Sequence, residues 1–439
     1  MLPKRRPPQR RLLRDFSSRT GVVVSFHYRS RDFQPSRDFV DRRNFLKWGG
    51  LGCLVLGGCG GGSTGASPGA VSAAPQGSVV APPTPAPAPT ENTAKTKTQF
   101  GVNCYDLFYK FMWSRLPFDP LSRLKPLKEM GITLVRFSAG PFWPDDWKVW
   151  EADPEKHLRA LDAVFDAADS LGMQLVPSVI WYPGGLSDHL GERYSAWGDA
   201  NSASRRYMAR HAGSIAQRYA RRSSLLMWEF SNEMNSFADL PNGYQFWPTI
   251  KPEVGTFTER TLSDNVTIVD IQNSYRHFND VVRQYDTTHP IGSGSHTPRE
   301  NQIHGASGSY ALDTRDQLIQ AMEQSMVPEY KVLSVHLYAK HIAKRFDANG
   351  TTYLEMLQLA KQTANKHGAK LFLGEFGVPK SDDSAADRAA LKAMIADIKA
   401  AGVDYATIWN YDWDYQADWS ITATNQRLWM LDEIKAANA

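Results

Sequence analysis

Eight short apolar runs, each followed by a stretch with amphipathic helical periodicity, fill the chain from Gln99 onward. This alternation limits the possible folds more than any other feature of the sequence. Runs of this length that are rich in β-branched and apolar residues predict buried strands. The expected strands are Gln99–Cys104, Ile132–Ser138, Gln174–Trp181, Leu225–Glu233, Pro290–Ser295, Val332–Tyr338, Lys370–Phe376 and Tyr405–Tyr411.

Helical patterns lie between these strands, and a last helix closes the chain. The clearest are Glu155–Leu171, Ser202–Arg221, Thr267–Tyr285, Thr314–Met326, Tyr353–His367, Ala385–Ala401 and Asn425–Ala437. Eight strands that each precede a helix predict an α/β fold, a (β/α)8 or TIM barrel. A doubly wound open sheet is the alternative. Because no glycine-rich phosphate loop follows the first strand, the nucleotide-binding forms of that sheet are disfavoured.

Charge is distributed unevenly along the chain. Residues 1–59 hold 13 Lys or Arg against 4 Asp or Glu, whereas residues 60–439 hold 37 against 42. The basic character therefore belongs to the N-terminal segment, and nothing in the remaining chain favours nucleic-acid binding. Three cysteines are too few for a disulfide scaffold, and we expect Cys104 to be a core packing residue.

The N-terminal segment resembles a bacterial export signal. Arg42-Arg43 stand before Phe-Leu-Lys, as in twin-arginine signals. The glycine-rich run that follows is shorter than the roughly 20 apolar residues of a membrane span. It ends in Leu56-Gly57-Gly58-Cys59, which resembles a lipobox. We therefore expect lipidation at Cys59 and a periplasmic or outer-membrane lipoprotein, held at the membrane only by its lipid anchor.

The next segment separates this leader from the folded part. Residues 60–97 consist mainly of Gly, Ala, Pro, Ser and Thr, which cannot bury enough apolar surface to offset the entropy of folding. We expect three parts: a leader over 1–59, a disordered linker over 60–97 and a single catalytic domain over 98–439. Residues 1–40 are unusually rich in arginine for a signal, so Val40 is an alternative start to Met1.

Two glutamates stand at the ends of apolar strands. The fourth strand ends Trp228-Glu229-Phe230-Ser231-Asn232-Glu233, and the seventh ends Gly374-Glu375-Phe376. In a (β/α)8 barrel the carboxyl ends of the strands surround the active site. Two carboxylates on opposite sides of that site are the minimal machinery for glycoside hydrolysis, one as acid and the other as nucleophile or base. Glu233 and Glu375 are therefore the predicted catalytic pair.

Other strand ends carry residues that suit the same chemistry. Arg136 would keep a nearby carboxylate ionised. His336 and Tyr338 alternate with Leu337, so both face the barrel mouth, where Tyr338 could orient a nucleophile. Trp409 offers a flat apolar face to a sugar ring. Trp181 follows the third strand and is a second candidate for substrate binding, although a tryptophan there could equally be a packing residue.

This ordered set resembles glycoside hydrolase family 5, the cellulase family of clan A. It comprises Arg136, Asn232-Glu233, His336-x-Tyr338, Glu375 and Trp409, and the resemblance covers residues 98–439. It implies a retaining hydrolase of β-linked polysaccharides, cellulase-like and endo-acting, without a cofactor. It further implies that Glu233 is the general acid/base, that Glu375 is the nucleophile and that Asn232 binds the sugar 2-hydroxyl. Retaining enzymes hold the two carboxyl groups about 5–5.5 Å apart.

One departure from the family leaves the substrate open. Many members carry a histidine after the third strand, where this chain has Val179-Ile180-Trp181-Tyr182-Pro183. The substrate could be a glucan, a mannan or another β-linked polysaccharide. The long insertion Ser236–Asp264 could favour exo action or add subsites.

Two alternatives use the same barrel. The chain could be a transglycosylase that acts on an envelope exopolysaccharide, or a glycan-binding lipoprotein without activity. The binder would be indicated by loss of a carboxylate or of Arg136, and all three are present. The sequence shows no metal-ligand cluster, so we expect no metal. We expect a monomer.

Overall fold

The computed structural model describes residues 97–439, except 113–117, 248–249, 340–341, 343–344 and 347–349. The expected leader, its Cys59, and the expected linker up to residue 96 lie outside the described residues.

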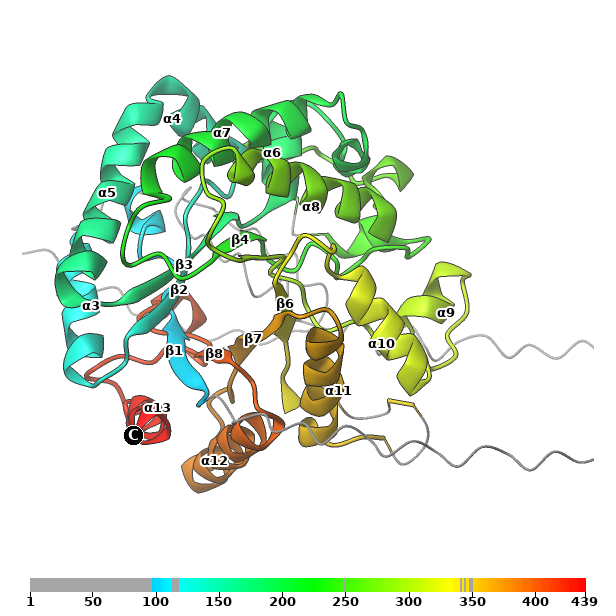
Figure 1. The fold of residues 1–439 in the computed structure, drawn as a ribbon. Coiled ribbons are helices and arrows are strands. Elements are labelled where there is room, and N and C mark those ends of the chain that lie inside the picture. Colours follow the sequence, from blue (N-terminus) through cyan, green and yellow to red (C-terminus); the bar gives the residue numbers. More distant parts are fainter. Residues whose placement is uncertain (1–96, 113–117, 248–249, 340–341, 343–344, 347–349) are drawn as a thin grey trace, which may run out of the picture. The chain divides into compact units, whose positions relative to one another are not determined.

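Eight parallel strands form a closed barrel in which each strand pairs with the next, and β8 pairs with β1 (Figure 1). The strands are β1 (Gln99–Asn103), β2 (Leu134–Ser138), β3 (Gln174–Ile180), β4 (Trp228–Ser231), β5 (Ile291–Gly292), β6 (Val332–His336), β7 (Lys370–Phe376) and β8 (Tyr405–Ile408). The predicted (β/α)8 barrel is confirmed, and the open sheet is excluded.

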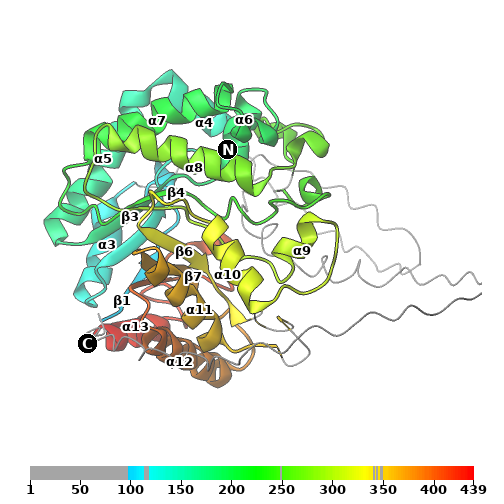
Figure 2. The same ribbon diagram turned by 45° about the vertical axis from the view of Figure 1, so that its right-hand side comes forward.

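Helices surround the barrel on its outside (Figure 2). They are α3 (Pro120–Glu129), α4 (Pro144–Ala152), α5 (Pro154–Leu171), α6 (Pro183–His189), α7 (Ala203–Tyr219), α8 (Ile268–Arg283), α9 (Gln302–Ala306), α10 (Arg315–Gln324), α11 (Tyr353–Lys366), α12 (Ser384–Ala401) and α13 (Trp429–Asn438). All seven helices expected by range are present, with ends shifted by a few residues. None of the described helices is both long and apolar enough to cross a membrane.

Helix ends follow local capping chemistry. α5 begins after Asp153, whose side chain accepts a hydrogen bond from the Lys156 amide, and it ends at Gly172 with a φ of 59°. α8 begins with a reciprocal pair of hydrogen bonds between Thr267 and Asp270. These contacts satisfy amides and carbonyls that have no partner inside the helix.

The sequence did not predict α3, α4, α6 and α9 as helices. These helices are short, and three of them begin with proline. α3 also has Pro126 in its interior, and α6 reads Pro-Gly-Gly in its first turn. Because glycine and proline weaken helical propensity, periodicity alone does not reveal such segments.

The core fills the barrel and the layer between strands and helices. One buried cluster comprises Leu134, Val176, Met227, Val332 and Phe372, from five different positions around the barrel. Trp228 is fully buried, and its indole donates to Asp286.

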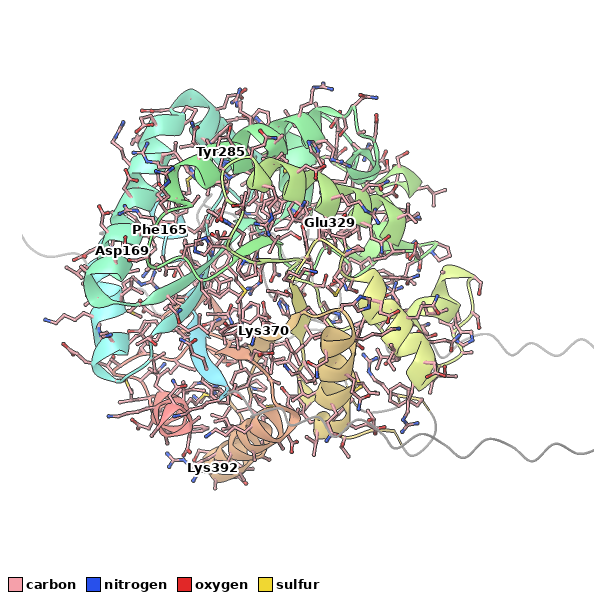
Figure 3. All side chains as sticks on the ribbon, viewed as in Figure 1. Phe165, Asp169, Tyr285, Glu329, Lys370 and Lys392 are labelled. Carbon is pink, nitrogen blue, oxygen red and sulfur yellow. The ribbon has the colours of Figure 1, made fainter. Side chains whose placement is uncertain are left out.

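Ring stacking fixes α5 against α7. Phe165, labelled in Figure 3, lies parallel to Tyr219, with ring centroids 4.3 Å apart and planes 7° apart. Trp147 and Trp150 of α4 are buried against Tyr207 and His211 of α7. These two tryptophans, which follow the second strand and could have formed a sugar subsite, therefore pack helices together.

Gly101 provides a test of barrel packing. A Cβ at Gly101 would lie 2.2 Å from the Leu134 carbonyl oxygen, because β1 and β2 pack backbone against backbone there. We expect Gly101→Ala to lower the free energy of unfolding by about 1–3 kcal/mol through overpacking. Gly213, inside α7, has room for a Cβ at 3.6 Å from its neighbours. Gly213→Ala should instead stabilise the protein by about 0.5–1 kcal/mol. Urea unfolding measures both, and equal effects would contradict this account.

Candidate active site

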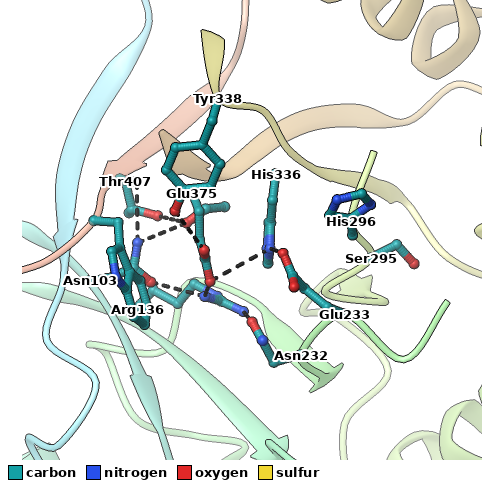
Figure 4. Close-up of polar contacts among 12 residues, drawn as sticks. Asn103, Arg136, Asn232, Glu233, Ser295, His296, His336, Tyr338, Glu375 and Thr407 are labelled. Atoms are coloured by element: carbon teal, nitrogen blue, oxygen red, sulfur yellow. Dashed lines mark hydrogen bonds and ion pairs between the residues drawn. The ribbon is translucent and has the colours of Figure 1, made fainter. Parts of the chain in front are cut away.

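The predicted site residues meet at the carboxyl ends of the strands (Figure 4). Arg136, His336 and Glu375 belong to β2, β6 and β7. Asn232 and Glu233 directly follow β4, and Tyr338 and Trp409 follow β6 and β8. The expected strands were thus slightly too long at this end, although the order of the residues around the barrel is as predicted.

A bulge in β7 directs Glu375. The β6 residues Val335 and His336 pair with Leu373 and Glu375, so Gly374 is an extra residue on β7. A Cβ at Gly374 would lie 2.7 Å from His336 Nε2, which only glycine avoids. Bulges next to active sites commonly redirect a side chain, and this one places Glu375 beside His336.

Three side chains fix the Glu375 carboxylate. Tyr338 donates its hydroxyl to Oε2 at 2.8 Å, and Arg136 donates Nη1 to Oε1 at 3.1 Å. Nδ1 of His336 lies 3.5 Å from Oε1. The carboxylate is buried, so each of these contacts acts with little screening by water.

Arg136 is fully buried and has four polar partners. Its Nε and Nη2 atoms contact the Glu229 carboxylate at 2.8–3.1 Å. Nη1 also donates to Asn103 Oδ1 at 2.9 Å, and Nη2 donates to Asn232 Oδ1 at 2.7 Å. A guanidinium suits such a network because its donors are fixed in one plane.

Glu233 occupies a constrained backbone position. Its φ is 52°, a left-handed conformation that is rare for a residue with a side chain, and its amide donates to the Gly294 carbonyl at 2.8 Å. Its carboxylate lies 2.9 Å from His336 Nδ1. Strain of this kind often marks a functional residue, since the surrounding contacts must hold it.

The two predicted catalytic carboxylates are close together. An oxygen of Glu233 and an oxygen of Glu375 lie within 4.8 Å of each other. His336 lies between them, since its Nδ1 approaches both carboxylates. The two carboxylates and the His336 imidazole therefore form one continuous network.

Burial dominates the proton affinities in the site. Burial raises the pKa of Glu375, and Glu233 adds to that rise. His336, Arg136 and Tyr338 lower this pKa without reversing the direction. Arg136 thus acts on this pKa in the expected direction, while burial outweighs it in the net shift. Burial also lowers the pKa of His336 to about 4, so its imidazole is neutral near pH 7.

The two aromatic candidates lie in one cluster. The rings of Trp181 and Trp409 are 6.2 Å apart, and both side chains are almost fully buried. The Arg136 guanidinium lies over the Trp181 ring, 4.6 Å from its centroid. The Trp409 indole donates to Gln416 Oε1. Trp181 therefore makes a cation–π contact with Arg136 and an edge-on ring contact with Tyr105 at 4.8 Å, while sugar binding by either tryptophan ring stays a prediction.

Sequence analysis missed three members of this site. Glu229 is a charged residue inside an otherwise apolar strand, and this position could have marked it as a site residue. Asn103 ends β1 and links Arg136 to the Gly374 carbonyl through its Nδ2 at 2.8 Å. Thr407 donates to the same carbonyl. Asn103 and Thr407 are uncharged residues of apolar strands, so their residue type alone does not mark them as site residues.

The fold also brings together a set of ligand types that the sequence did not reveal. Glu233, His336 and Glu375 present one ligand atom each within 4.8 Å. They come from separate strands, so no sequence spacing marks them. The Arg136 guanidinium already contacts Glu375, and its positive charge opposes a cation there.

Comparison with known proteins gives a family and a set of similar folds. The family model described as "Cellulase (glycosyl hydrolase family 5)" matches residues 92–416. None of the curated protein sequences matches the chain.

Solved structures of similar fold include several enzymes that act on mannose-containing substrates. The endo-β-1,4-mannanase of Thermotoga petrophila is 15% identical with a TM-score of 0.53, covering 79% of this chain and 77% of the other. The endo-1,4-β-mannanase of Rhizomucor miehei is 12% identical with a TM-score of 0.55, covering 78% and 95%. The exo-β-1,4-mannosidase of an Opitutaceae bacterium is 18% identical with a TM-score of 0.51, covering 78% and 60%.

The lowered pKa of His336 predicts a loss of stability in acid. The pKa is about 4 in the folded chain and 6.5 ordinarily, so the unfolded chain binds more protons between these values. The fold should lose up to about 3 kcal/mol from this group as the pH falls from 6.5 to 4. In His336→Asn this part of the loss should disappear. Urea unfolding at several pH values measures it, and parallel pH dependences in both proteins would contradict it.

Proposed function

Since the chain belongs to the cellulase family, glycosyl hydrolase family 5, we propose that it hydrolyses β-linked glycans with retention of anomeric configuration. Glu375 is the proposed nucleophile and Glu233 the proposed general acid/base. The distance between these two carboxylates carries the proposal. Their nearest oxygens lie within 4.8 Å, which fits the roughly 5–5.5 Å of retaining enzymes better than the 6.5–9.5 Å of inverting ones.

In the first step, Glu375 attacks the anomeric carbon while Glu233 protonates the leaving oxygen. A covalent glycosyl-enzyme forms, and the leaving sugar departs as an alcohol. In the second step Glu233, now ionised, removes a proton from water, which attacks the anomeric carbon and releases Glu375. The same two residues thus exchange roles between the steps.

The neighbours of each carboxylate support these roles. Tyr338 and Arg136 bond different oxygens of Glu375, so they fix its orientation for attack. His336 is neutral near pH 7 and touches Glu233 through Nδ1. In one tautomer Nδ1 accepts a hydrogen bond from the protonated Glu233 carboxyl, and in the other it donates a hydrogen bond to the ionised carboxylate. His336 can therefore follow Glu233 through both protonation states.

Substrate binding is assigned to Asn232, Trp409 and Trp181. Arg136 holds Oδ1 of Asn232, which directs the amide Nδ2 as the donor for a sugar 2-hydroxyl. The tryptophan rings supply apolar faces for sugar rings. Two of the enzymes with a similar fold are endo-mannanases, so β-mannan is the first polymer to test, followed by β-glucans and xylans.

The location of the enzyme is a separate proposal. Arg42-Arg43 and the lipobox ending at Cys59 support export by a twin-arginine route and anchoring by lipid. An anchored hydrolase would act on polymers at the cell's own envelope or on imported oligomers. The expected linker over residues 60–97 would then hold the barrel away from the membrane surface.

Neutralising either carboxylate tests the assignment. For the full chain, we expect Glu375→Gln to abolish release of reducing ends from the polymer that the wild type cleaves. Glu233→Gln should lower the rate on that polymer by about 10²–10⁴-fold, the usual contribution of a general acid. It should retain activity on aryl glycosides, whose leaving groups need little protonation.

The control is Glu329→Gln, an exposed glutamate before β6 that is labelled in Figure 3. It should cleave the polymer at the wild-type rate. Proton NMR of the first product checks retention of configuration. Full activity in Glu375→Gln, or a product of inverted configuration, would overturn the proposal.

Chelation tests the assignment of the Glu233–His336–Glu375 cluster to acid–base chemistry. Because Arg136 contacts Glu375, we expect no metal to be needed there. Dialysis of the full chain against EDTA should leave the hydrolysis rate unchanged. A rate that falls on dialysis and returns with a divalent cation would mean that the cluster holds a metal.

A further inference from the structure

Glu229 is a third carboxylate in the network and has no role in the steps above. It lies in β4 with 1% of its surface exposed. Both its oxygens accept from Arg136 Nε, at 2.9 and 3.1 Å, and Oε1 also lies 2.8 Å from Nη2. Gly294 backs this carboxylate, since a Cβ there would lie 2.9 Å from Glu229 Cδ. The position therefore accepts the carboxylate only because residue 294 has no side chain.

Arg136 divides its charge between two carboxylates. Glu229 faces the Nε and Nη2 side of the guanidinium with three contacts, whereas Glu375 receives a single bond from Nη1. The other partners of Arg136, Asn103 and Asn232, are neutral amides. Both carboxylates are buried, so the Coulomb energy of each pair is large, and Glu229 takes the larger share.

Two described groups lower the pKa of Glu375 through their charge, His336 first and Arg136 second, and of these Arg136 keeps its charge at neutral pH. The groups that face it are Arg136 from β2, Glu233 after β4, and His336 and Tyr338 from β6 and the residues that follow it. His336 is neutral near pH 7 because burial lowers its pKa to about 4. One positive charge thus serves two carboxylates, with a third close by.

We propose that Glu229 is a positioning residue that orients Arg136 and, by taking most of its charge, sets the proton affinity of Glu375. The role of Glu375 as nucleophile rests on the proposed function, but the electrostatic coupling does not. The burial of Glu375 already raises the pKa of its carboxyl group. Removing the Glu229 charge frees Arg136 for Glu375 and also removes a like charge. Both changes favour the ionised form of Glu375.

Carboxyl NMR tests the coupling without a substrate. The full chain is labelled with glutamate enriched in carbon-13 at the side-chain carboxyl, and the Glu375 resonance is assigned with Glu375→Gln. In Glu229→Gln we expect the Glu375 titration midpoint to fall by about one pH unit or more, as usual for a carboxylate that gains an adjacent opposite charge. An unchanged or raised midpoint in the folded variant would overturn the proposal.

Two further variants keep the result interpretable. Glu229→Asp keeps the charge but shortens the side chain, so the titration midpoint of Glu375 should fall less than in Glu229→Gln. If Glu229→Gln fails to fold, Glu229→Asp becomes the test. An unchanged Glu375 midpoint in Glu229→Asp would then overturn the proposal. Asp188→Asn is the matched control, because Asp188 accepts two 2.6 Å bonds from Arg260 in another buried pair. It should lower stability and leave the Glu375 midpoint in place; a midpoint that falls equally in it would mean that loss of any buried ion pair moves Glu375.

If a substrate is found, activity gives a second readout. The acidic limb of kcat/KM should move to lower pH in Glu229→Gln by the same amount as the NMR midpoint. A chain that cleaves none of the tested glycans would contradict the proposed function and still allow the NMR test. A limb that stays in place while the midpoint moves would overturn Glu229 as a determinant of catalysis.

Discussion

The buried guanidinium of Arg136 is the interaction on which the site depends. It reaches Asn103 on β1, Glu229 and Asn232 on and directly after β4, and Glu375 on β7. An unpaired arginine at this depth would cost several kcal/mol, so its partners must be present together. The network therefore both stabilises the barrel interior and orients groups that approach the substrate.

The alternation of apolar runs and helical stretches was sufficient to predict the barrel. It was sufficient because the strands are buried on both faces and are therefore mostly apolar, with few polar residues such as Arg136 and Glu229. Strand-end residues such as Glu233 and Glu375 could then be brought together by topology alone, because parallel strands in a barrel all end at one mouth. The exact end of each strand could not be predicted, because it depends on the hydrogen bonds that the strand makes with its neighbours in the sheet.

Features set by tertiary contact could not be predicted. The extra residue at Gly374 is visible only in the pairing of β7 with its neighbours. Trp147 and Trp150 are of the residue type that stacks on sugar rings, but both are buried against α7, and this burial depends on how α4 packs on α7. The proton affinity of Glu375 likewise follows from burial, which an arginine at a favourable sequence position does not reveal.

Asn103 gives the site a dependence on the closure of the barrel. It stands on β1, and its Nδ2 reaches the carbonyl groups of Gly374, Thr407 and Ile408 across the seam where the first strand meets the last. Its Oδ1 meanwhile orders Arg136. A growing chain holds both carboxylates well before β8 is made, yet their alignment awaits the final strand. Catalytic competence should consequently arise all at once, at the end of folding, and no partly folded chain should cleave glycans.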